Sequence, residues 1–192
     1  MIRASESQFN TLAGDRLPRQ YFFREKSELK TKDDIQNLKN ELGWYKIFVS
    51  HEKFELLLKE MKVGKNSYDL KNVENVDSLY CVYVGKSSKL KKRLNAHFGN
   101  SRENTTLKTS LTAVLTKKDE PIEEQQRKVS DFMADAYFEC GYKTDFKDGE
   151  YLCVWEAKEI NKYIRILNID CNENKEAQSF VKSLTKLRNH RR

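Results

Sequence analysis

The stretch LYCVYVGKSSKLKKRLNAHF, residues 79–98, constrains the fold more than any other part of the chain. Its apolar first half is typical of a buried β-strand, and a glycine then leads into a basic amphipathic helix. Arg93 and His97 lie four residues apart and therefore project from the same helix face. Five of the eight residues 86–93 are basic, a charge density that suits an anionic partner better than a core.

A second strand is predicted upstream, at GWYKIFVS (43–50). Alternation places on one face of this strand Tyr45, Ile47 and Val49, and on the other Trp44, Lys46 and Phe48. In the strand at 79–85 it places together Leu79, Cys81 and Tyr83, with Tyr80, Val82 and Val84 opposite. If the two strands pair, Tyr45 and Tyr83 lie side by side near the start of the basic helix. Taken alone, a strand tyrosine is more often a packing residue than a catalyst.

Several motifs in order resemble those of the GIY-YIG nuclease superfamily. They are GWY at 43–45, YVGK at 83–86, LKKRLNAHF at 90–98, and a later glutamate, Glu156, with Asn168 twelve residues on. The segments TTLKTSLTAVL (105–115) and SDFMADAYFE (130–139) also resemble a bacterial branch of small stand-alone members. The similarity covers about residues 43–168.

The resemblance implies an α+β fold with a small, three-stranded, mainly antiparallel sheet flanked by helices. The strands are expected at about 43–50, 79–85 and 135–144. The expected organisation is an N-terminal arm and helix at 1–42, a nuclease domain at 43–168 with a helical insertion at about 51–76, and a basic tail at 169–192.

Two features depart from the family pattern. The first is the insertion, because 37 residues separate Tyr45 from Tyr83. Its apolar stripe predicts a helix and consists of Phe54, Leu57, Leu58 and Met61. This element is either a source of substrate selectivity or a dimerisation surface. The second is Arg165, which stands where many relatives carry proline.

The resemblance assigns five catalytic residues: Tyr45, Tyr83, Arg93, His97 and Glu156. It implies Tyr45 as the general base and Tyr83 as a hydrogen-bonding partner of the nucleophile or phosphate. Which tyrosine is the base stays open, because both are mostly protonated at neutral pH. His97 either relays the proton or binds a phosphate oxygen.

The residue types suit these roles. The planar, permanently charged fork of Arg93 can bind two phosphate oxygens at once. A single carboxylate, Glu156, fits one Mg²⁺ that keeps several waters, with Mn²⁺ as a substitute. Glu159 shares nearly the same helical face and ranks second as the metal ligand.

Four further residues are expected to bind phosphate or nucleic acid: Lys86, Lys89, Lys92 and Asn168. Lys86 follows the strand glycine, so it is a phosphate ligand or a tyrosine activator. Asn168 is also expected to fix the loop after the metal-site helix.

Composition agrees with a small enzyme that meets nucleic acid. The 192 residues are 38% hydrophobic, enough for one core, and the net charge of +7 favours an anionic partner. The four cysteines lack metal-ligand spacing, and Cys81 is expected as a buried free thiol. The first twenty residues contain charges and no apolar run, so no signal peptide, no membrane span and a cytoplasmic location are expected.

Helical periodicity predicts helices at about 33–42, 105–117, 122–134 and 149–164, and an apolar stripe in the tail at 179–192. The basic helix, the aromatic and basic arm at 18–26 and this tail are expected to contact phosphates.

The sequence thus favours a metal-dependent endonuclease acting on DNA, with RNA and a homodimer left open. A restriction, repair or mobile-element role also stays open. The alternative is a non-catalytic nucleic-acid-binding protein that retains the fold. Such a module needs the basic face but not the paired tyrosines or Glu156, so the retained set favours the enzyme.

Overall fold

The computed structural model describes residues 28–99, 105–142 and 149–191. The strands are β1 (Gly43–Ser50), β2 (Asn75–Val76), β3 (Leu79–Ser87) and β4 (Tyr137–Tyr142). The α-helices are α2 (His51–Met61), α3 (Leu90–Phe98), α4 (Thr106–Leu115), α5 (Ile122–Met133), α6 (Gly149–Lys162) and α7 (Gln178–Arg191). Short 3₁₀ helices are η1 (Lys32–Asn37), η2 (Lys65–Ser67), η3 (Leu70–Asn72) and η4 (Lys175–Ala177). The aromatic arm expected at 18–26 lies outside the described residues.

The α+β class is confirmed, but the sheet has four strands rather than three. The strand order is β2-β3-β1-β4, and every neighbouring pair is antiparallel. The additional strand, β2, is only two residues long and pairs with the start of β3. A strand of two residues is too short to show the alternation by which strands are recognised in a sequence. In the insertion, the sequence therefore predicted the helix but not β2.

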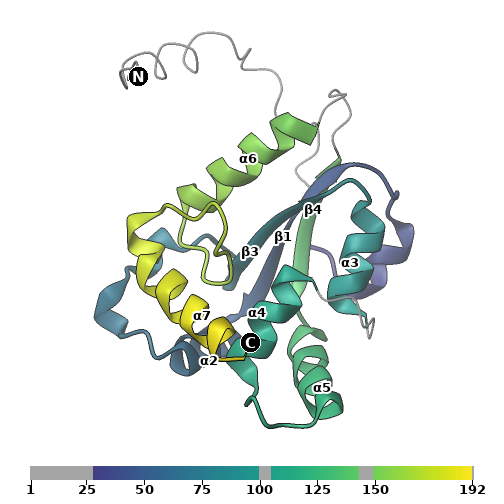
Figure 1. Cartoon of the computed structure of the whole chain (residues 1–192). Coiled ribbons are helices and arrows are strands. Elements are labelled where there is room, and N and C mark those ends of the chain that lie inside the picture. The colour runs from purple at the N-terminus through teal and green to yellow at the C-terminus, as the bar shows by residue number, and fades with distance from the viewer. Residues whose placement is uncertain (1–27, 100–104, 143–148, 192) are drawn as a thin grey trace, which may run out of the picture.

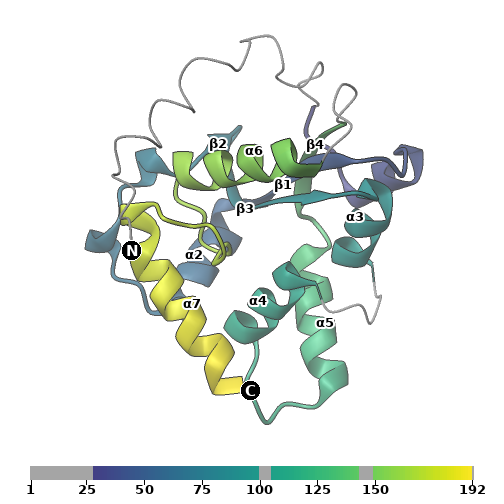
Figure 2. The ribbon, with the colours of Figure 1, turned by 45° about the horizontal axis from the view of Figure 1, so that its top comes forward.

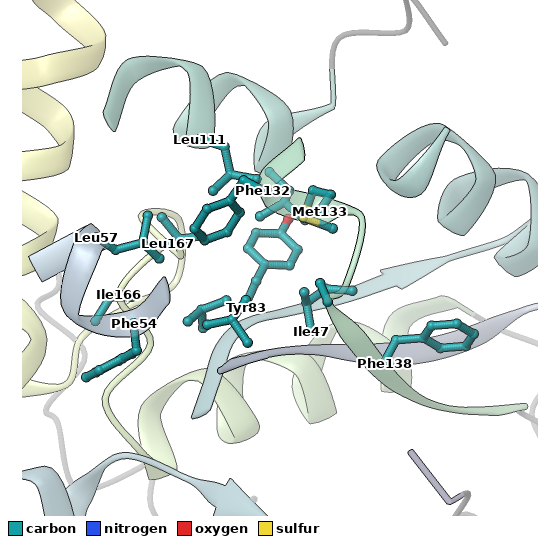
Figure 3. Close-up of a cluster of buried hydrophobic side chains, with 14 of the residues drawn as sticks. Ile47, Phe54, Leu57, Tyr83, Leu111, Phe132, Met133, Phe138, Ile166 and Leu167 are labelled. Carbon is teal, nitrogen blue, oxygen red and sulfur yellow. The ribbon is translucent and has the colours of Figure 1, made fainter. Parts of the chain in front are cut away.

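The sheet is covered unequally on its two faces. Helix α6 lies on one face, while α2, α3, α4, α5 and α7 gather on the other (Figures 1 and 2). The face covered by these five helices carries the main core, in which Tyr83 and Ile47 lie among side chains of α2, α4 and α5 (Figure 3). The smaller core beneath α6 is formed by Phe48, Cys81, Val84 and Ile160. Cys81 is the buried free thiol that the sequence predicted.

The pairing of β1 with β3 puts Tyr45 and Tyr83 on the face of the sheet that carries the main core. Tyr45 lies opposite Gly85, and Tyr83 lies opposite Ile47. Between Ile47 and Phe48 the register shifts, because Val82 is an extra residue in β3. The expected alternation along β3 is therefore wrong at one point: Cys81 belongs to the core beneath α6, whereas Val82 and Tyr83 both belong to the main core.

The helical insertion is an integral part of the main core. Ser50 caps α2 by accepting a hydrogen bond from the Lys53 backbone N–H, at 3.4 Å. All four residues of the apolar stripe, Phe54, Leu57, Leu58 and Met61, are buried within the chain. The alternative in which this stripe binds a second copy is therefore wrong, because the surface it requires is already covered.

The segment before β1 is less helical than its periodicity predicted. Only η1 forms, and at its end Leu38 turns to an extended conformation. The helix predicted at 149–164 does form, as α6, despite its β-prone residues. Trp155 of α6 packs on Trp44 with ring centroids 4.9 Å apart, which seats the helix on the sheet.

The basic tail folds as α7 and packs against α2 and α4. Phe180 and Leu184 are fully buried, and the Ser183 hydroxyl donates to the Met61 carbonyl at 2.5 Å. The tail therefore helps to complete the core as well as carrying charge. Within the described residues, no helix has the length and apolar character needed to cross a bilayer.

Removing the buried Leu184 side chain tests this role of α7. Leu184→Ala should lower the free energy of unfolding by about 2–5 kcal/mol, because it leaves a cavity in the core. Lys186→Ala, at an exposed position on the same helix, should stay within about 0.5 kcal/mol of the wild type. Urea unfolding followed by circular dichroism measures both; equal effects would contradict the packing described here.

Candidate active site

Two glycines allow the close packing from which the site is built. A Cβ atom at Gly85 would lie 2.5 Å from Cζ of Tyr45, so only glycine leaves room for the ring that crosses it. At the second glycine, Gly43, a Cβ atom would lie 2.9 Å from Cδ2 of Leu90. The first contact fixes the Tyr45 ring, and the second brings the start of α3 against β1.

The two phenols are diagonal neighbours on the main-core face. The ring centroids of Tyr45 and Tyr83 are 6.2 Å apart, and the rings are inclined by 29°. Tyr45 is 2% exposed and Tyr83 8% exposed, so Tyr83 lies slightly closer to solvent. The expectation that these residues lie side by side on adjacent strands is confirmed.

Helix α3 brings His97 onto Tyr45. The Tyr45 hydroxyl lies 2.7 Å from Nε2 of His97, and Nδ1 of His97 lies 2.9 Å from the Thr105 hydroxyl oxygen. His97 is 2% exposed, and burial, helped by the charges of Arg93 and Lys108, lowers its pKa to about 3. The imidazole is therefore neutral, and both of its ring nitrogens are engaged, by Tyr45 and by Thr105.

Arg93 lies one helical turn before His97, with its side chain exposed. Its charge opposes the effect of burial and lowers the pKa of Tyr45 and of Tyr83. The guanidinium is thus close enough to influence both phenols while remaining accessible. Two backbone hydrogen bonds fix the start of this helix: Leu90 N–H donates to the Glu41 carbonyl, at 2.9 Å, and Lys92 N–H donates to the Asn40 side chain, at 3.1 Å.

Glu156 comes from α6 and pairs with Lys86, near the end of β3. Its Oε2 atom lies 3.4 Å from the Lys86 ammonium, and its side chain is 21% exposed. Burial raises the pKa of Glu156, which Lys86 partly offsets. The Glu156 charge in turn raises the pKa of both tyrosines. Lys86 therefore pairs with Glu156, and it also contacts the Cys153 thiol.

Burial dominates the ionisation of the two phenols. It raises the pKa of Tyr45 well above its usual value and that of Tyr83 to about 12. The sequence expectation named Lys86 as a cation that favours phenolate. The cation that lowers both pKa values is instead Arg93, because Lys86 is engaged with Glu156.

Glu159, the second candidate for a metal ligand, belongs to a different network. Its carboxylate lies 2.9 Å from the Lys46 ammonium, which also binds Glu74 at 2.8 Å. Glu74 continues the network to the fully buried Arg165. Burial lowers the pKa of Lys46, but its two carboxylate partners outweigh this effect and raise it. Glu159 is thus neutralised beneath α6, which favours Glu156 as the carboxylate of the site.

Asn168 is placed differently from the sequence expectation that it binds phosphate. Its side-chain amide accepts a hydrogen bond from Val84 N–H and donates one to the Val84 carbonyl, both at 2.9 Å. Leu167 N–H adds a hydrogen bond to the Val82 carbonyl, at 3.1 Å. The buried amide thus holds the open edge of β3 between Tyr83 and Gly85. We correct its role from phosphate contact to positioning of that strand.

The remaining basic residues, Lys89 and Lys92, are exposed at the start of α3. Two other residues near the site were missed in the sequence. Asp170 raises the pKa of Tyr83 and of Glu156 by its charge. Thr105 bonds His97, and only its position at the start of a predicted helix hinted at a capping role.

The donor set fits one hard cation. Glu156 is a partly buried carboxylate whose pKa is raised by burial and by the neighbouring Asp170, so a cation there would relieve unfavourable negative charge. Among the described residues there is no group of three or more potential metal ligands. A cation at Glu156 would therefore take its other ligands from water and substrate, as Mg²⁺ commonly does.

Comparison with known families identifies the family of this chain. The sequence pattern of the GIY-YIG catalytic domain matches residues 43–190, and the chain belongs to that family. The match extends through most of α7, which is consistent with the packing of this helix on the core. Neither the curated proteins nor the solved structures include a significant match.

The packing of Tyr45 over Gly85 predicts a specific cost for one added methyl group. Gly85→Ala should lower the free energy of unfolding by about 1–3 kcal/mol, because the Tyr45 ring is enclosed and has little room to move. Gly64→Ala is the matched control, because a Cβ there meets only Ser67 Oγ at 3.6 Å. Denaturant unfolding of both variants is the measurement, and a Gly85→Ala protein as stable as the control would contradict the geometry.

The buried His97 predicts how stability depends on pH. The unfolded chain takes up a proton near pH 6.5, whereas the folded protein resists it until about pH 3. The contribution of neutral His97 to the free energy of unfolding is thus complete above pH 6.5 and is lost as the pH falls toward 3. His97→Gln should weaken this decline, whereas His51→Gln, at an exposed site, should retain it. Urea midpoints measured from pH 7 down to 4 test this; identical slopes in all three proteins would contradict it.

Proposed function

We propose that this protein is a metal-dependent endonuclease that hydrolyses phosphodiester bonds in DNA. The observation that carries the proposal is the geometry around Tyr45, whose ring centroid is 6.2 Å from that of Tyr83 and whose hydroxyl is 2.7 Å from Nε2 of His97. The charges of Arg93 and Glu156 both influence the pKa of these two phenols, so a permanently charged cation and a carboxylate accompany the pair. Membership of the GIY-YIG family supports a nuclease-type activity.

The substrate is held by the exposed surface of α3. Lys89 and Lys92 attract the DNA backbone, and Arg93 binds two oxygens of the phosphate to be cleaved. The same guanidinium stabilises the charge that develops on the phosphate during attack. Because one group serves both purposes, Arg93 contributes to affinity and to rate.

The phenols act on the attacking water. Tyr45 first releases its own phenolic proton to solvent. Tyr83, the more accessible of the two, then orients the water by a hydrogen bond, and the Tyr45 phenolate takes up a proton of that water as the new O–P bond forms. The bond from phosphorus to the leaving ester oxygen breaks, and that oxygen takes a proton from solvent, which yields a phosphate monoester and an alcohol. His97 holds the Tyr45 hydroxyl in place through its 2.7 Å hydrogen bond.

Glu156 is the residue that would hold Mg²⁺, or Mn²⁺ in its place. The bound cation would supply positive charge beside the phosphate and the leaving oxygen. Lys86, which pairs with the same carboxylate at 3.4 Å, would then be available to the phosphate.

Glu156→Gln tests the proposal most simply. The substitution keeps the size of the side chain but removes the charge, so cleavage should fall by roughly 100-fold or more while DNA binding in EDTA is retained. The assay follows nicking of supercoiled plasmid and cutting of flapped and branched DNA with Mg²⁺, Mn²⁺ or EDTA.

Two matched variants complete that experiment. Glu123→Gln, at an exposed position on α5, should cleave like the wild type. Glu159→Gln should retain cleavage as far as it folds, because this residue pairs with Lys46. A chain that binds DNA but never cuts it would support the non-catalytic alternative, and an inactive Glu159→Gln beside an active Glu156→Gln would move the metal site.

A further inference from the structure

Thr105 connects the start of α4 to the site through His97. Its hydroxyl oxygen lies 2.9 Å from Nδ1 of His97 and accepts the Lys108 backbone N–H, at 3.2 Å, as the N-cap of α4. The residue is 2% exposed. One hydroxyl thus caps a helix and contacts the imidazole that bonds Tyr45.

The hydrogens of this chain of contacts can be assigned by counting donors and acceptors. A neutral imidazole carries one N–H, and a threonine hydroxyl has one proton and two lone pairs. Lys108 N–H occupies one lone pair of Thr105. If the Thr105 proton is given to Nδ1, the imidazole proton must be on Nε2, from which it is donated to the Tyr45 oxygen.

The reverse arrangement uses the same contacts less well. Nδ1–H would then donate to Thr105, and the buried hydroxyl would need another acceptor for its proton. Among the described residues, His97 and Lys108 are the partners recorded for this hydroxyl, and neither would accept that proton. A buried donor without a partner is unfavourable, which disfavours this arrangement. It would also make Tyr45 give its proton to Nε2, so the phenol would be held in its protonated form.

The first arrangement also agrees with the other side of Tyr45. Tyr83 lies there, with its ring centroid 6.2 Å from that of Tyr45. When Nε2 donates to the Tyr45 oxygen, the Tyr45 hydroxyl can turn its own proton away from His97. Every donor in the series from Lys108 to His97 is then used once.

We propose that Thr105 is a positioning residue that keeps the His97 proton on Nε2, so that His97 donates to Tyr45 and stabilises its phenolate. The catalytic part of this inference rests on the proposed nuclease function, in which Tyr45 accepts a proton from water. The tautomer itself does not depend on that function and can be measured separately.

The charged and titratable groups around this series come from four elements. They are Tyr83 on β3, Arg93 on α3, Lys108 on α4 and Glu156 on α6. Thr105→Ser keeps every contact of these groups, and Thr105→Val removes only the contacts of the hydroxyl itself, to His97 and to the Lys108 backbone N–H. A change in the behaviour of Tyr45 in such variants is thus attributable to the lost hydroxyl.

The first test reads the tautomer without DNA or metal. Long-range ¹H–¹⁵N spectra of the full chain distinguish a protonated Nε2 from a protonated Nδ1, and His97→Gln assigns the signals. The wild type and Thr105→Ser should carry the proton on Nε2. Thr105→Val should lose this preference and populate both tautomers, because either tautomer then leaves Nδ1 without a partner. A wild-type protein protonated on Nδ1 would overturn the proposal, whether or not the protein cleaves DNA.

The second test measures single-turnover cleavage against pH. Thr105→Val should be roughly 10-fold slower at neutral pH, with the rise in rate displaced to higher pH, because the phenolate loses its donor. Thr105→Ser should stay within about twofold of the wild type, because it keeps the hydroxyl.

Loss of the helix cap alone gives a different pattern. It would lower the melting temperature of Thr105→Val but leave the shape of its pH profile unchanged. Identical pH profiles for Thr105→Val and Thr105→Ser would refute the positioning role. If the wild type shows the Nε2–H tautomer but no cleavage under any condition, the proposed function fails while the assigned tautomer stands.

Discussion

The close contact between the Tyr45 ring and the main chain of Gly85 is the constraint on which the rest of the site depends. It requires β1 and β3 to pair in one register, because a shift by one residue would turn Tyr45 to the face beneath α6. That register also places Tyr83 beside Tyr45. Asn168 maintains it from the outer edge of β3, where its amide replaces a neighbouring strand. The asparagine of the family motif thus acts on the tyrosines through the backbone.

Charged groups are arranged differently on the two faces of the sheet. On the main-core face, the tyrosines and His97 are buried. The charge of Arg93 influences the pKa of all three, and the charge of Glu156 influences that of the two tyrosines. On the other face, the acidic and basic side chains neutralise one another, from Glu159 through Lys46 and Glu74 to Arg165. This second network ties α6 to β1 and to the insertion. It thereby supports the helix that carries Glu156.

The sequence predicted the parts of the structure that repeat regularly or carry unusual chemistry. The faces of β1 followed from alternation, and α6 from its helical spacing despite β-prone residues. The bulge at Val82 could not be foreseen, because it depends on how β3 fits its partner. Glu156 and Glu159 differ by less than one helical turn, so only their partners separate them. The contact of Thr105 with His97 was missed for another reason, because helix capping alone accounts for a threonine at that position.

The central claim is that Arg93, the two tyrosines and Glu156 surround one scissile phosphate. A crystal structure of the protein with duplex DNA and Ca²⁺, whose looser coordination should slow turnover, tests it most directly. The account predicts one backbone phosphate bonded to the Arg93 guanidinium, a tyrosine hydroxyl facing it, and the cation on Glu156. A backbone bound instead at the pocket of about 360 Å³ lined by Lys118, Arg188 and Arg191, with no phosphate at Arg93, would contradict it.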